Sequence, residues 1–365
     1  MVDMKKEMNR GTVLVAMSGG VDSSVAAKIL TDEGLPCVGI TMKLFDPSKL
    51  ASDVPTPTCG TAAEAEDAAR IANRLAIPFH VIDFSDDFQR NVIEYFIETY
   101  VKGGTPNPCV QCNRTMKFGK LYEAGKQLGC EEIATGHYAR IDKSGSRPLL
   151  LRAKDPTKDQ SYVLWQLSRE QLRVTRFPLG DMTKDEVREI ALSNGFCNAT
   201  RRDSQDICFI PDGDYVSFIE RNTNLQFPSG DFIDVNGKPL GKHQGMIRYT
   251  VGQRKGLGIA FGKPTYVCKK DPVTNTVTLG DNDQLFSREL TAKQINLIAM
   301  DRMDSPIRVQ AKVRYSARPA WATVEQSDDD TIALRFDEAQ RAISPGQSVV
   351  LYDGDVVLGG GIIQS

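Results

Sequence analysis

The sequence of 365 residues contains no apolar run that could cross a bilayer, because nowhere do roughly eighteen apolar residues follow one another. The stretch MVDMKKEMNRG at its start carries charges but no apolar segment of the kind that marks a secretory signal. We therefore expect a cytoplasmic protein that does not act at a membrane. Internal repeats and low-complexity tracts are also missing. A composition of 41% hydrophobic and 25% charged residues is ordinary for a globular chain of two or three domains.

The chain also has little net charge, −2, which by itself favours no charged partner. Its basic residues are unevenly distributed, however. Two segments, 241–270 and 307–324, contain no Asp or Glu. Their basic residues are Lys242, Arg248, Arg254, Lys255, Lys263, Lys269 and Lys270 in the first segment and Arg308, Lys312, Arg314 and Arg318 in the second. Such segments suit a polyanion held by part of the surface, although either could also be a solvated basic face.

Eight cysteines do not indicate a disulfide framework in a chain expected to be cytoplasmic. Catalytic or metal-binding roles are more typical of the clustered ones. For five of them we expect the role of a small buried apolar residue: Cys37, Cys59, Cys130, Cys197 and Cys268.

The first half of the chain alternates strands with helices. Apolar, β-branched runs predict strands at 12–15, 36–44, 79–84 and 131–136, and helical periodicity predicts helices from about 21 to 34 and over 61–75, 86–100 and 116–128. This alternation predicts an α/β fold with a doubly wound parallel sheet, whose ligands lie over the carboxyl ends of the strands. The loop at 16–24, Met42 and the pair Gly136 and His137 all follow such ends, so we expect them to face one pocket.

Beyond this half, a capping box at Thr183 predicts a helix to residue 193, and a second helix is predicted at 215–221. Short alternating runs then take over, at 264–268, 276–279, 308–315, 331–336 and 348–352. They predict one or two small β-domains, the last of them a barrel.

The stretch AMSGGVDSS, residues 16–24, joins the first strand to the first helix. Gly19 and Gly20 allow backbone N–H groups to approach an anion, and the helix N-terminus adds unpaired donors and a positive dipole end. Ser18, Ser23 and Ser24 supply hydroxyl groups. A phosphate-binding loop is therefore predicted. It is not a Walker A loop, since no Gly-Lys-Ser/Thr follows the glycines. It resembles the pyrophosphatase loop (PP-loop) of ATP pyrophosphatases, which adenylate a carbonyl or carboxylate oxygen.

A second informative stretch is GGTPNPCVQCN, residues 103–113. Pro106 and Pro108 stiffen it and argue against a regular helix before Cys109. We expect an ordered, non-helical loop that carries Cys109 and Cys112, and such loops are usually functional. Farther along, DSQDICFI at 203–210 places Cys208 at the edge of an apolar strand.

Seven motifs together resemble the bacterial tRNA 2-thiouridylases, the MnmA/TrmU family, over nearly the whole chain and in the family's order. They are SGGVDSS, TPNPCVQCN, ATGHYAR, KDQSY, DSQDICFI, TVGQRKGLGI and PGQSVVLYDGDVVLGGG. The resemblance implies a PP-loop ATP-pyrophosphatase domain at 1–222, a small central tRNA-contacting domain at 223–285 and a C-terminal β-barrel at 286–365. It also implies ATP as a substrate, Mg²⁺, tRNA as a partner and a sulfur-relay donor protein. ATP would adenylate the C2 oxygen of the wobble uridine, and sulfur from a cysteine persulfide would replace that oxygen.

The resemblance also assigns residues. Cys208 matches the persulfide carrier and Cys112 the nucleophile, which either attacks the persulfide or acts on the substrate, so that a Cys112–Cys208 disulfide would follow. The ATP site would comprise Ala16, Met17, Ser18, Gly19, Gly20, Val21, Asp22, Ser23, Met42 and Gly136, with Met42 packed on the adenine and Asp22 orienting the loop or binding Mg²⁺. The extruded base would meet Asn107, Pro108 and Cys109. The remaining tRNA contacts would be His137, Lys158, Asp159, Gln160, Arg314, Tyr315 and Gln347.

One position departs from the commonest family pattern, because many relatives carry Asp where this chain has Cys109. Cys109, Cys112 and Cys208 could therefore hold an iron–sulfur cluster with an open iron, which would replace the persulfide relay. A zinc site is a further alternative. We expect the relay.

Two other functions fit parts of the sequence. A PP-loop ligase could act on a small carboxylate, but it would need neither paired cysteines nor a basic β-rich C-terminal part. A non-catalytic, ATP-regulated RNA-binding module would make the cysteines dispensable.

Overall fold

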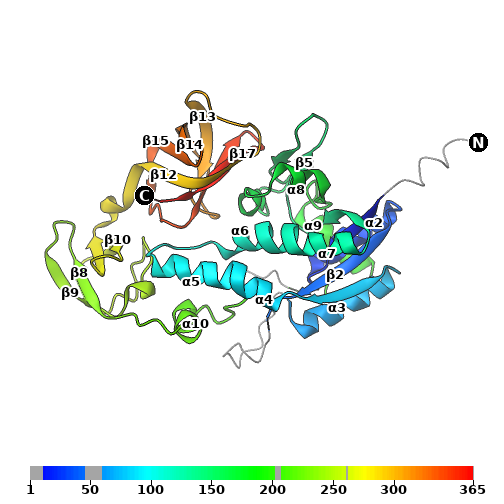
Figure 1. Ribbon diagram of the computed structural model, residues 1–365, viewed down its shortest axis with the longest axis horizontal. Coiled ribbons are helices and arrows are strands. Elements are labelled where there is room, and N and C mark those ends of the chain that lie inside the picture. The colour runs from blue at the N-terminus through cyan, green and yellow to red at the C-terminus, as the bar shows by residue number, and fades with distance from the viewer. Residues whose placement is uncertain (1–10, 46–59, 202–206, 260–261, 365) are drawn as a thin grey trace, which may run out of the picture. The chain divides into compact units, whose positions relative to one another are not determined.

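The computed structural model describes residues 11–45, 60–201, 207–259 and 262–364 (Figure 1). The chain forms two compact units. The first comprises Met1–Val92, Cys109–Gly213 and Asp355–Val357, and the second comprises Ile93–Pro108, Asp214–Gly354 and Leu358–Ser365. Cys59 and residues 203–206 of the DSQDICFI motif lie outside the described residues.

The first unit is built on a five-stranded sheet in the order β3-β2-β1-β4-β7, and each adjacent pair is parallel. Its strands are β1 (Thr12–Ala16), β2 (Cys37–Lys43), β3 (Phe79–Asp83), β4 (Cys130–Ala134) and β7 (Thr175–Arg176). The central strand β1 is fully buried at Val13, Leu14 and Val15, as expected for a strand covered on both faces. The predicted α/β class with a doubly wound parallel sheet is confirmed.

The helices within residues 11–45, 60–201, 207–259 and 262–364 follow the predicted alternation closely. They are α2 (Val21–Asp32), α3 (Ala62–Arg74), α4 (Ser85–Phe88), α5 (Glu94–Val101), α6 (Pro108–Cys112), α7 (Tyr122–Gln127), α8 (Arg169–Val174), α9 (Lys184–Ser193) and α10 (Tyr215–Arg221), with π-helical turns η2 (Gln89–Ile93) and η3 (Asn113–Leu121) and 3₁₀ turns η4 (Ser161–Leu164), η5 (Met246–Arg248) and η6 (Asn282–Leu285). Capping boxes open α3, α8 and α9 at Thr61, Ser168 and Thr183.

The expectation of a non-helical loop around the first cysteine pair is wrong. Cys109 and Cys112 lie in α6, which begins at Pro108 and continues through η3 into α7. Proline fits the first position of a helix, because its missing N–H is not needed there and its fixed φ suits the helix. Pro108 therefore starts the helix rather than excluding it.

The second unit contains two β-structures. One is a four-stranded sheet in the order β10-β11-β8-β9, made of β8 (Gly230–Ile233), β9 (Pro239–His243), β10 (Tyr266–Asp271) and β11 (Thr276–Gly280). The other is a barrel in the order β12-β15-β14-β13-β16-β17, which β12 and β17 close by pairing with each other. Its strands are β12 (Phe286–Leu297), β13 (Ile307–Lys312), β14 (Ala320–Asp328), β15 (Thr331–Arg341), β16 (Ser348–Asp353) and β17 (Val356–Ile363). The predicted C-terminal barrel is confirmed.

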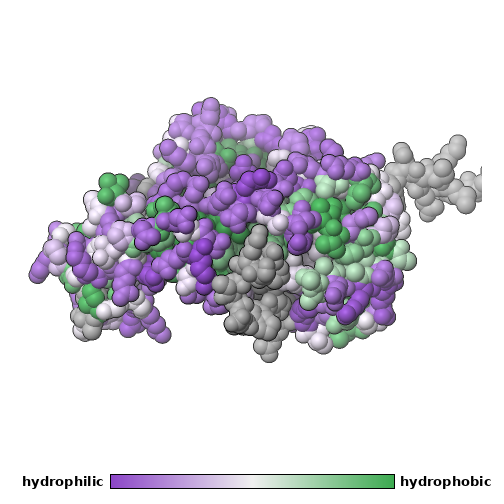
Figure 2. All heavy atoms as spheres, turned by 60° about the horizontal axis from the view of Figure 1, so that its bottom comes forward, coloured by the Kyte–Doolittle hydropathy of each residue, from purple (hydrophilic) through white to green (hydrophobic). Residues whose placement is uncertain are grey.

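A small hairpin, β5 (Arg140–Asp142) and β6 (Leu149–Leu151), was not predicted. In the first unit Leu151 pairs with Val356. Polar side chains cover most of the face in Figure 2, interrupted by apolar patches. Across the described part of the chain, no helix is long and apolar enough to span a membrane.

Candidate active site

The loop between β1 and α2 turns sharply at Gly19, whose φ of +76° is in the left-handed region. A Cβ atom at Gly19 would lie 2.3 Å from the carbonyl oxygen of Glu64, so α3 packs directly against this turn. The extended backbone of Gly20 then caps α2 without a side chain. Because no capping side chain bonds to the first turn of α2, its N–H groups can serve an anion.

Hydroxyl groups fix the shape of this loop. Ser23 Oγ lies 3.2 Å from Ser18 N, 3.3 Å from Ser18 Oγ and 3.1 Å from Gly20 O. Ser24 Oγ donates to the same Gly20 oxygen at 2.8 Å. The serines thus bond within the loop and hold its backbone in place around the helix terminus.

Asp22, in the first turn of α2, binds a buried lysine from α9. Lys184 Nζ lies 2.7 Å from Asp22 Oδ1 and 2.9 Å from Asp22 Oδ2, and Tyr138 OH donates to Oδ1 at 2.8 Å. Lys184 is only 5% exposed, and its ammonium lies 5.8 Å from the centre of the Tyr138 ring. The loop therefore has a fixed cation beside it, although it lacks a Walker lysine. Lys184 was not predicted as a site residue.

Two further side chains hold the carbonyl oxygen of Gly19, and neither was predicted. Asn198 Nδ2 donates to it at 2.8 Å and to Ser24 Oγ at 3.0 Å, while Arg201 donates to it at 3.3 Å. Arg201 also pairs with Asp67 of α3 at 2.7 Å. These bonds turn the Gly19 carbonyl toward the protein, which leaves the N–H side of the loop for a ligand.

Gly136 lies against the first turn of α2, as its place after β4 predicts. A Cβ atom there would lie 2.6 Å from both Asp22 C and Ser23 N, so only glycine fits. Met42, at the carboxyl end of β2, is buried at 8% exposure. The structure thus brings Gly136 to the phosphate-binding loop, whereas the packing of Met42 on adenine stays a prediction.

Cys109 and Lys117 lie on one helical segment, in α6 and η3. A π-helical turn takes about 4.4 residues, and such turns are frequent at functional sites. The protein around Cys109 desolvates its thiol and raises the pKa, although the residue is exposed, and the positive charge of Lys117 opposes that rise. Cys112 is half-buried. The positive charge of Lys117 thus favours the thiolate form of Cys109, against the effect of desolvation.

His137 is buried between Phe118 and Phe177, whose ring centres lie 6.0 and 5.9 Å from its own. Burial holds its pKa well below the usual range, and Lys117 adds to this effect. A neutral ring can accept a hydrogen bond at Nε2 from Lys117, 3.4 Å away, and donate from Nδ1 to Thr135 Oγ1 at 2.6 Å. His137 therefore orients Lys117, and its contact with tRNA stays a prediction.

Cys208 is half-buried and lies in a turn rather than in the predicted strand. Ile210 N donates to Ile207 O at 2.9 Å, which closes the turn around Cys208. The next residue, Phe209, is buried and packs edge-on against Phe88 at 5.7 Å. The apolar residues that suggested a strand instead anchor a short turn to the core of the first unit.

Among the other cysteines that the structure describes, two meet the expectation of burial in full. Cys37 and Cys130 are buried and Cys268 is half-buried. Cys197 is exposed, with its sulfur 3.7 Å from Asp67 Oδ1, so the expectation of burial is wrong there. It follows the end of α9 at the surface, where no apolar layer covers it.

The predicted tRNA contacts differ in what their side chains do. Asp159 accepts bonds from Ala153 N, Ser161 N and Ser161 Oγ, and Gln160 Oε1 accepts one from Tyr138 N at 2.9 Å. Both therefore order their own loop. Arg314 and Tyr315, by contrast, are exposed just after β13. Exposure makes them accessible to a large polyanion.

The first basic segment is partly neutralised within the second unit. Lys242, Arg248 and Lys263 pair with Asp231, Glu220 and Asp281, and Lys270 is buried. Arg254, Lys255 and Lys269 are exposed. The uninterrupted positive run in the sequence is therefore weaker on the folded surface, because its acidic partners come from other segments.

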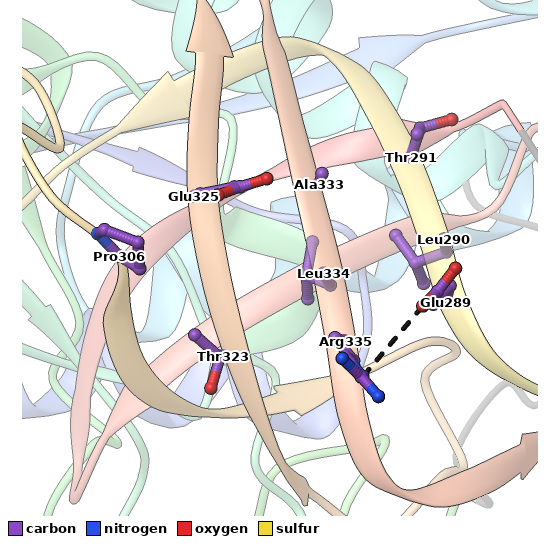
Figure 3. A pocket seen from close by; sticks show the side chains of 9 residues that line it. All are labelled: Glu289, Leu290, Thr291, Pro306, Thr323, Glu325, Ala333, Leu334 and Arg335. Carbon is purple, nitrogen blue, oxygen red and sulfur yellow. Dashed lines mark ion pairs between the residues drawn. The ribbon is translucent and has the colours of Figure 1, made fainter.

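A cavity of about 820 Å³ lies on β12, β14 and β15 of the barrel. Figure 3 shows its lining, where Glu289 and Arg335 face each other at 4.0 Å. The lining residues are Glu289, Leu290, Thr291, Pro306, Thr323, Glu325, Ala333, Leu334 and Arg335. None of the predicted site residues is among them.

Family models match the chain in three consecutive parts. Residues 11–212 match the tRNA methyl transferase HUP domain, 217–281 the tRNA methyl transferase PRC-barrel domain and 287–363 the aminomethyltransferase beta-barrel domain. A parallel-sheet HUP domain followed by these two domains defines a class of tRNA-modifying enzymes.

Similarity to individual proteins narrows this class. The chain is 49% identical over 354 residues to the tRNA-specific 2-thiouridylase MnmA of Clostridioides difficile, which covers 96% of this chain and 98% of the relative. The MnmA of Acetivibrio thermocellus is 47% identical over 98% of this chain and 100% of its own length. That of Clostridium perfringens is 45% identical over 98% and 99%. The chain belongs to the bacterial tRNA-specific 2-thiouridylase family, MnmA/TrmU, which consists of sulfurtransferases.

Proposed function

We propose that this chain is a tRNA 2-thiouridylase, which uses ATP to replace the C2 oxygen of the wobble uridine by sulfur. The observation that carries the proposal is the similarity to a named 2-thiouridylase, 49% identity over 96% of the chain. The phosphate-binding loop and its buried cation support it, because they supply what an ATP-splitting step needs.

The first step activates the base. The C2 carbonyl of uridine resembles that of a urea and is a poor electrophile until its oxygen is modified. Its oxygen attacks the α-phosphorus of ATP, an O–P bond forms, and the bond to the β-phosphate breaks to release pyrophosphate. The N–H groups at the start of α2 would stabilise the charge that develops on the phosphates, and Lys184 would hold that turn in place through Asp22.

Mg²⁺, when bound with ATP, would neutralise phosphate charge. Of the two roles predicted for Asp22, its contacts favour orienting the loop over binding Mg²⁺, since both of its oxygens already bind Lys184. A carboxylate paired in this way orients the lysine and the loop. We therefore do not assign Asp22 as a metal ligand, and the metal would be held chiefly by the phosphates.

The second step delivers sulfur. Cys208 carries a persulfide received from a donor protein, and Cys112 attacks the sulfur of Cys208, forming a disulfide and releasing hydrosulfide. Hydrosulfide adds to C2, and the C–O bond breaks so that AMP leaves. In the variant of this route, the terminal persulfide sulfur adds to C2 first and AMP leaves. Cys112 then attacks the sulfur of Cys208, which breaks the S–S bond and releases 2-thiouridine. Both routes leave a Cys112–Cys208 disulfide, which a thiol reductant must reduce before the next turnover.

An iron–sulfur cluster on Cys109, Cys112 and Cys208 is the alternative source of sulfur. Within the ranges that the structure describes, which include all three cysteines, no three His, Cys, Asp or Glu side chains are gathered as a metal ion requires. These three cysteines therefore do not present a preformed set of ligands for a cluster. Anaerobic purification with iron and sulfide analysis separates the two sources, because the relay predicts full activity in iron-free protein.

The target uridine must leave the anticodon stack to reach this chemistry. We assign Asn107, Pro108 and Cys109 to the extruded base and the exposed Arg314 and Tyr315 to tRNA outside it. The test is the stoichiometry of products: one AMP and one pyrophosphate should form per 2-thiouridine, and only with tRNA present. AMP formation with a small carboxylate in place of tRNA would instead identify a ligase.

A further inference from the structure

Residues 104–106, which lead into Asn107, are held by hydrogen bonds to other segments of the chain. Pro106 and Pro108 have no N–H group, so residues 104–108 cannot form a regular ladder, yet Gly104 and Pro106 are buried. Buried backbone groups need partners, and here they must come from other segments. Partners are found in α5, in β10 and in the turn before β16, all in the second unit.

The turn at 345–347 makes three of these bonds. Thr105 N donates to Pro345 O at 2.7 Å, and Gln347 Nε2 donates to Thr105 O at 2.9 Å and to Pro106 O at 3.2 Å. Gly346 has a φ of +86°, and a Cβ atom there would lie 2.9 Å from Thr105 N. The backbones of residues 104–106 and 345–347 are therefore in contact. The side-chain amide of Gln347 donates its hydrogen bonds to the carbonyl oxygens of Thr105 and Pro106.

Lys270 of β10 adds a further bond, beside the one that Gly104 N donates to Thr99 O at 2.8 Å. Its ammonium lies 3.4 Å from Gly104 O and 5.8 Å from the centre of the Tyr100 ring, which itself stacks on Tyr215 at 4.6 Å. Lys270 is 9% exposed, and burial lowers its pKa to about 8. Burying a lysine is unfavourable unless it has a specific partner, so its placement against this carbonyl points to a particular role.

We propose that Gln347 and Lys270 are positioning residues, which fix the backbone at 104–106 so that Asn107 and Pro108 present the target uridine in a reactive geometry. This inference rests on the proposed function, and it assigns to Gln347 a role other than direct contact with tRNA. Asn107 directly follows Pro106, whose carbonyl oxygen is held by Gln347, so the position of Asn107 depends on this bond. Misplacement by about 1 Å can cost about 100-fold in rate when reacting groups must be aligned.

The variants are Gln347→Met, which keeps bulk but removes the donor, and Lys270→Met. Gln340→Met is the matched control for the first, since Gln340 Nε2 donates to Glu338 O within the same strand, β15. Lys269→Met is the control for the second, because Lys269 is the exposed neighbour in the same strand. Each variant is assayed for the thiolation rate at saturating tRNA, for the Kd of tRNA and for amide hydrogen exchange at Gly104 and Thr105.

We expect Gln347→Met and Lys270→Met to speed exchange at 104–105 and to lower the saturated rate at least tenfold. The Kd of tRNA should change less than twofold, and both controls should behave as wild type. A Kd that weakens as much as kcat/KM falls would overturn the proposal for Gln347 and restore a tRNA contact. Faster exchange with an unchanged rate would overturn it for both residues. If Gln347→Met does not fold, Lys270→Met tests the same positioning of residues 104–106 through the bond from β10. Absence of thiolation in wild type would contradict the proposed function. Amide hydrogen exchange at Gly104 and Thr105 would still show whether Gln347 and Lys270 hold this backbone.

Discussion

Lys184 Nζ and Asp22 Oδ1 lie 2.7 Å apart, although 162 positions separate the two residues in the chain. The pair joins the first turn of α9 to the first turn of α2. It places a buried cation where the sequence shows only a glycine-rich loop. The first turn of α2 is therefore held by a residue from a helix far away in the sequence.

Replacing Lys184 with Met should leave the carboxylate of Asp22 in a mostly enclosed site without its cation. Breaking such a pair is strongly unfavourable. We expect the affinity for ATP to fall by on the order of tenfold or more, with a lower thermal midpoint. The double variant Asp22→Asn with Lys184→Met should recover the thermal midpoint but not the ATP affinity. Lys28→Met, which removes an exposed pair with Asp32 on α2, serves as control and should change neither quantity measurably. Unchanged ATP binding in Lys184→Met would contradict the role of this lysine.

The turn at Gly19 allows a matched comparison with Gly34. Both have positive φ, +76° and +72°, but a Cβ atom at Gly34 meets nothing within 4 Å whereas one at Gly19 meets Glu64 O. Gly34→Ala should therefore cost only about 1 kcal/mol of unfolding free energy, from backbone strain. Gly19→Ala should cost more and should abolish ATP binding, measured by calorimetry. Equal effects of the two substitutions would show that the packing of α3 on the loop is unimportant.

Glu64 predicts a pH dependence of stability. Desolvation by burial raises its pKa from its ordinary value of 4.5 to about 7, against the opposing hydrogen bonds from Thr61. Because the folded state holds the proton more tightly, this group should cost stability as pH rises from about 5 to about 7, by up to about 3 kcal/mol. Glu64→Gln should remove that loss. Urea unfolding at about pH 5 and pH 8 measures it, and a difference between variant and wild type that is constant with pH would contradict the buried carboxyl.

The sequence predicts the sheet and the glycine turn between β1 and α2 well, because both depend on local patterns. An apolar β-branched run, two glycines and a helical period specify β1, the turn and α2 without distant information. The strand predicted around Cys208 fails for the opposite reason. The apolar residues Ile207, Phe209 and Ile210 suit a buried turn as well as a strand. The packing of Phe209 on Phe88 depends on the fold and cannot be seen in the sequence.

Long-range pairs could not be read from the sequence. Nothing in the chain links Gln347 to Thr105, or Asn198 to Gly19, until the fold brings them together. Lys184 did leave a signal, since a lysine at the first position of a helix opposes the dipole and needs a compensating anion. The helix at Pro108 left one as well, because proline is common at that position.

Exposed basic residues should set the salt dependence of tRNA binding. Arg314 is exposed, while Arg308 is paired with Asp337. We expect Arg314→Ala to weaken binding and to reduce the slope of log K against log salt by about one, as the loss of one phosphate contact does. Arg308→Ala, as control, should change the slope less. A flat salt dependence in wild type would contradict a phosphate-binding surface on this unit.

The central claim is that ATP-dependent activation and a thiol of this chain together convert the wobble uridine to 2-thiouridine. The most direct test is mass spectrometry of tRNA nucleosides after incubation with ATP, Mg²⁺ and a persulfide donor, for wild type, Cys208→Ser and the exposed-cysteine control Cys197→Ser. We expect 2-thiouridine with wild type and Cys197→Ser, and none with Cys208→Ser or without ATP. Thiolation that persists in Cys208→Ser, or that proceeds without ATP, would contradict it.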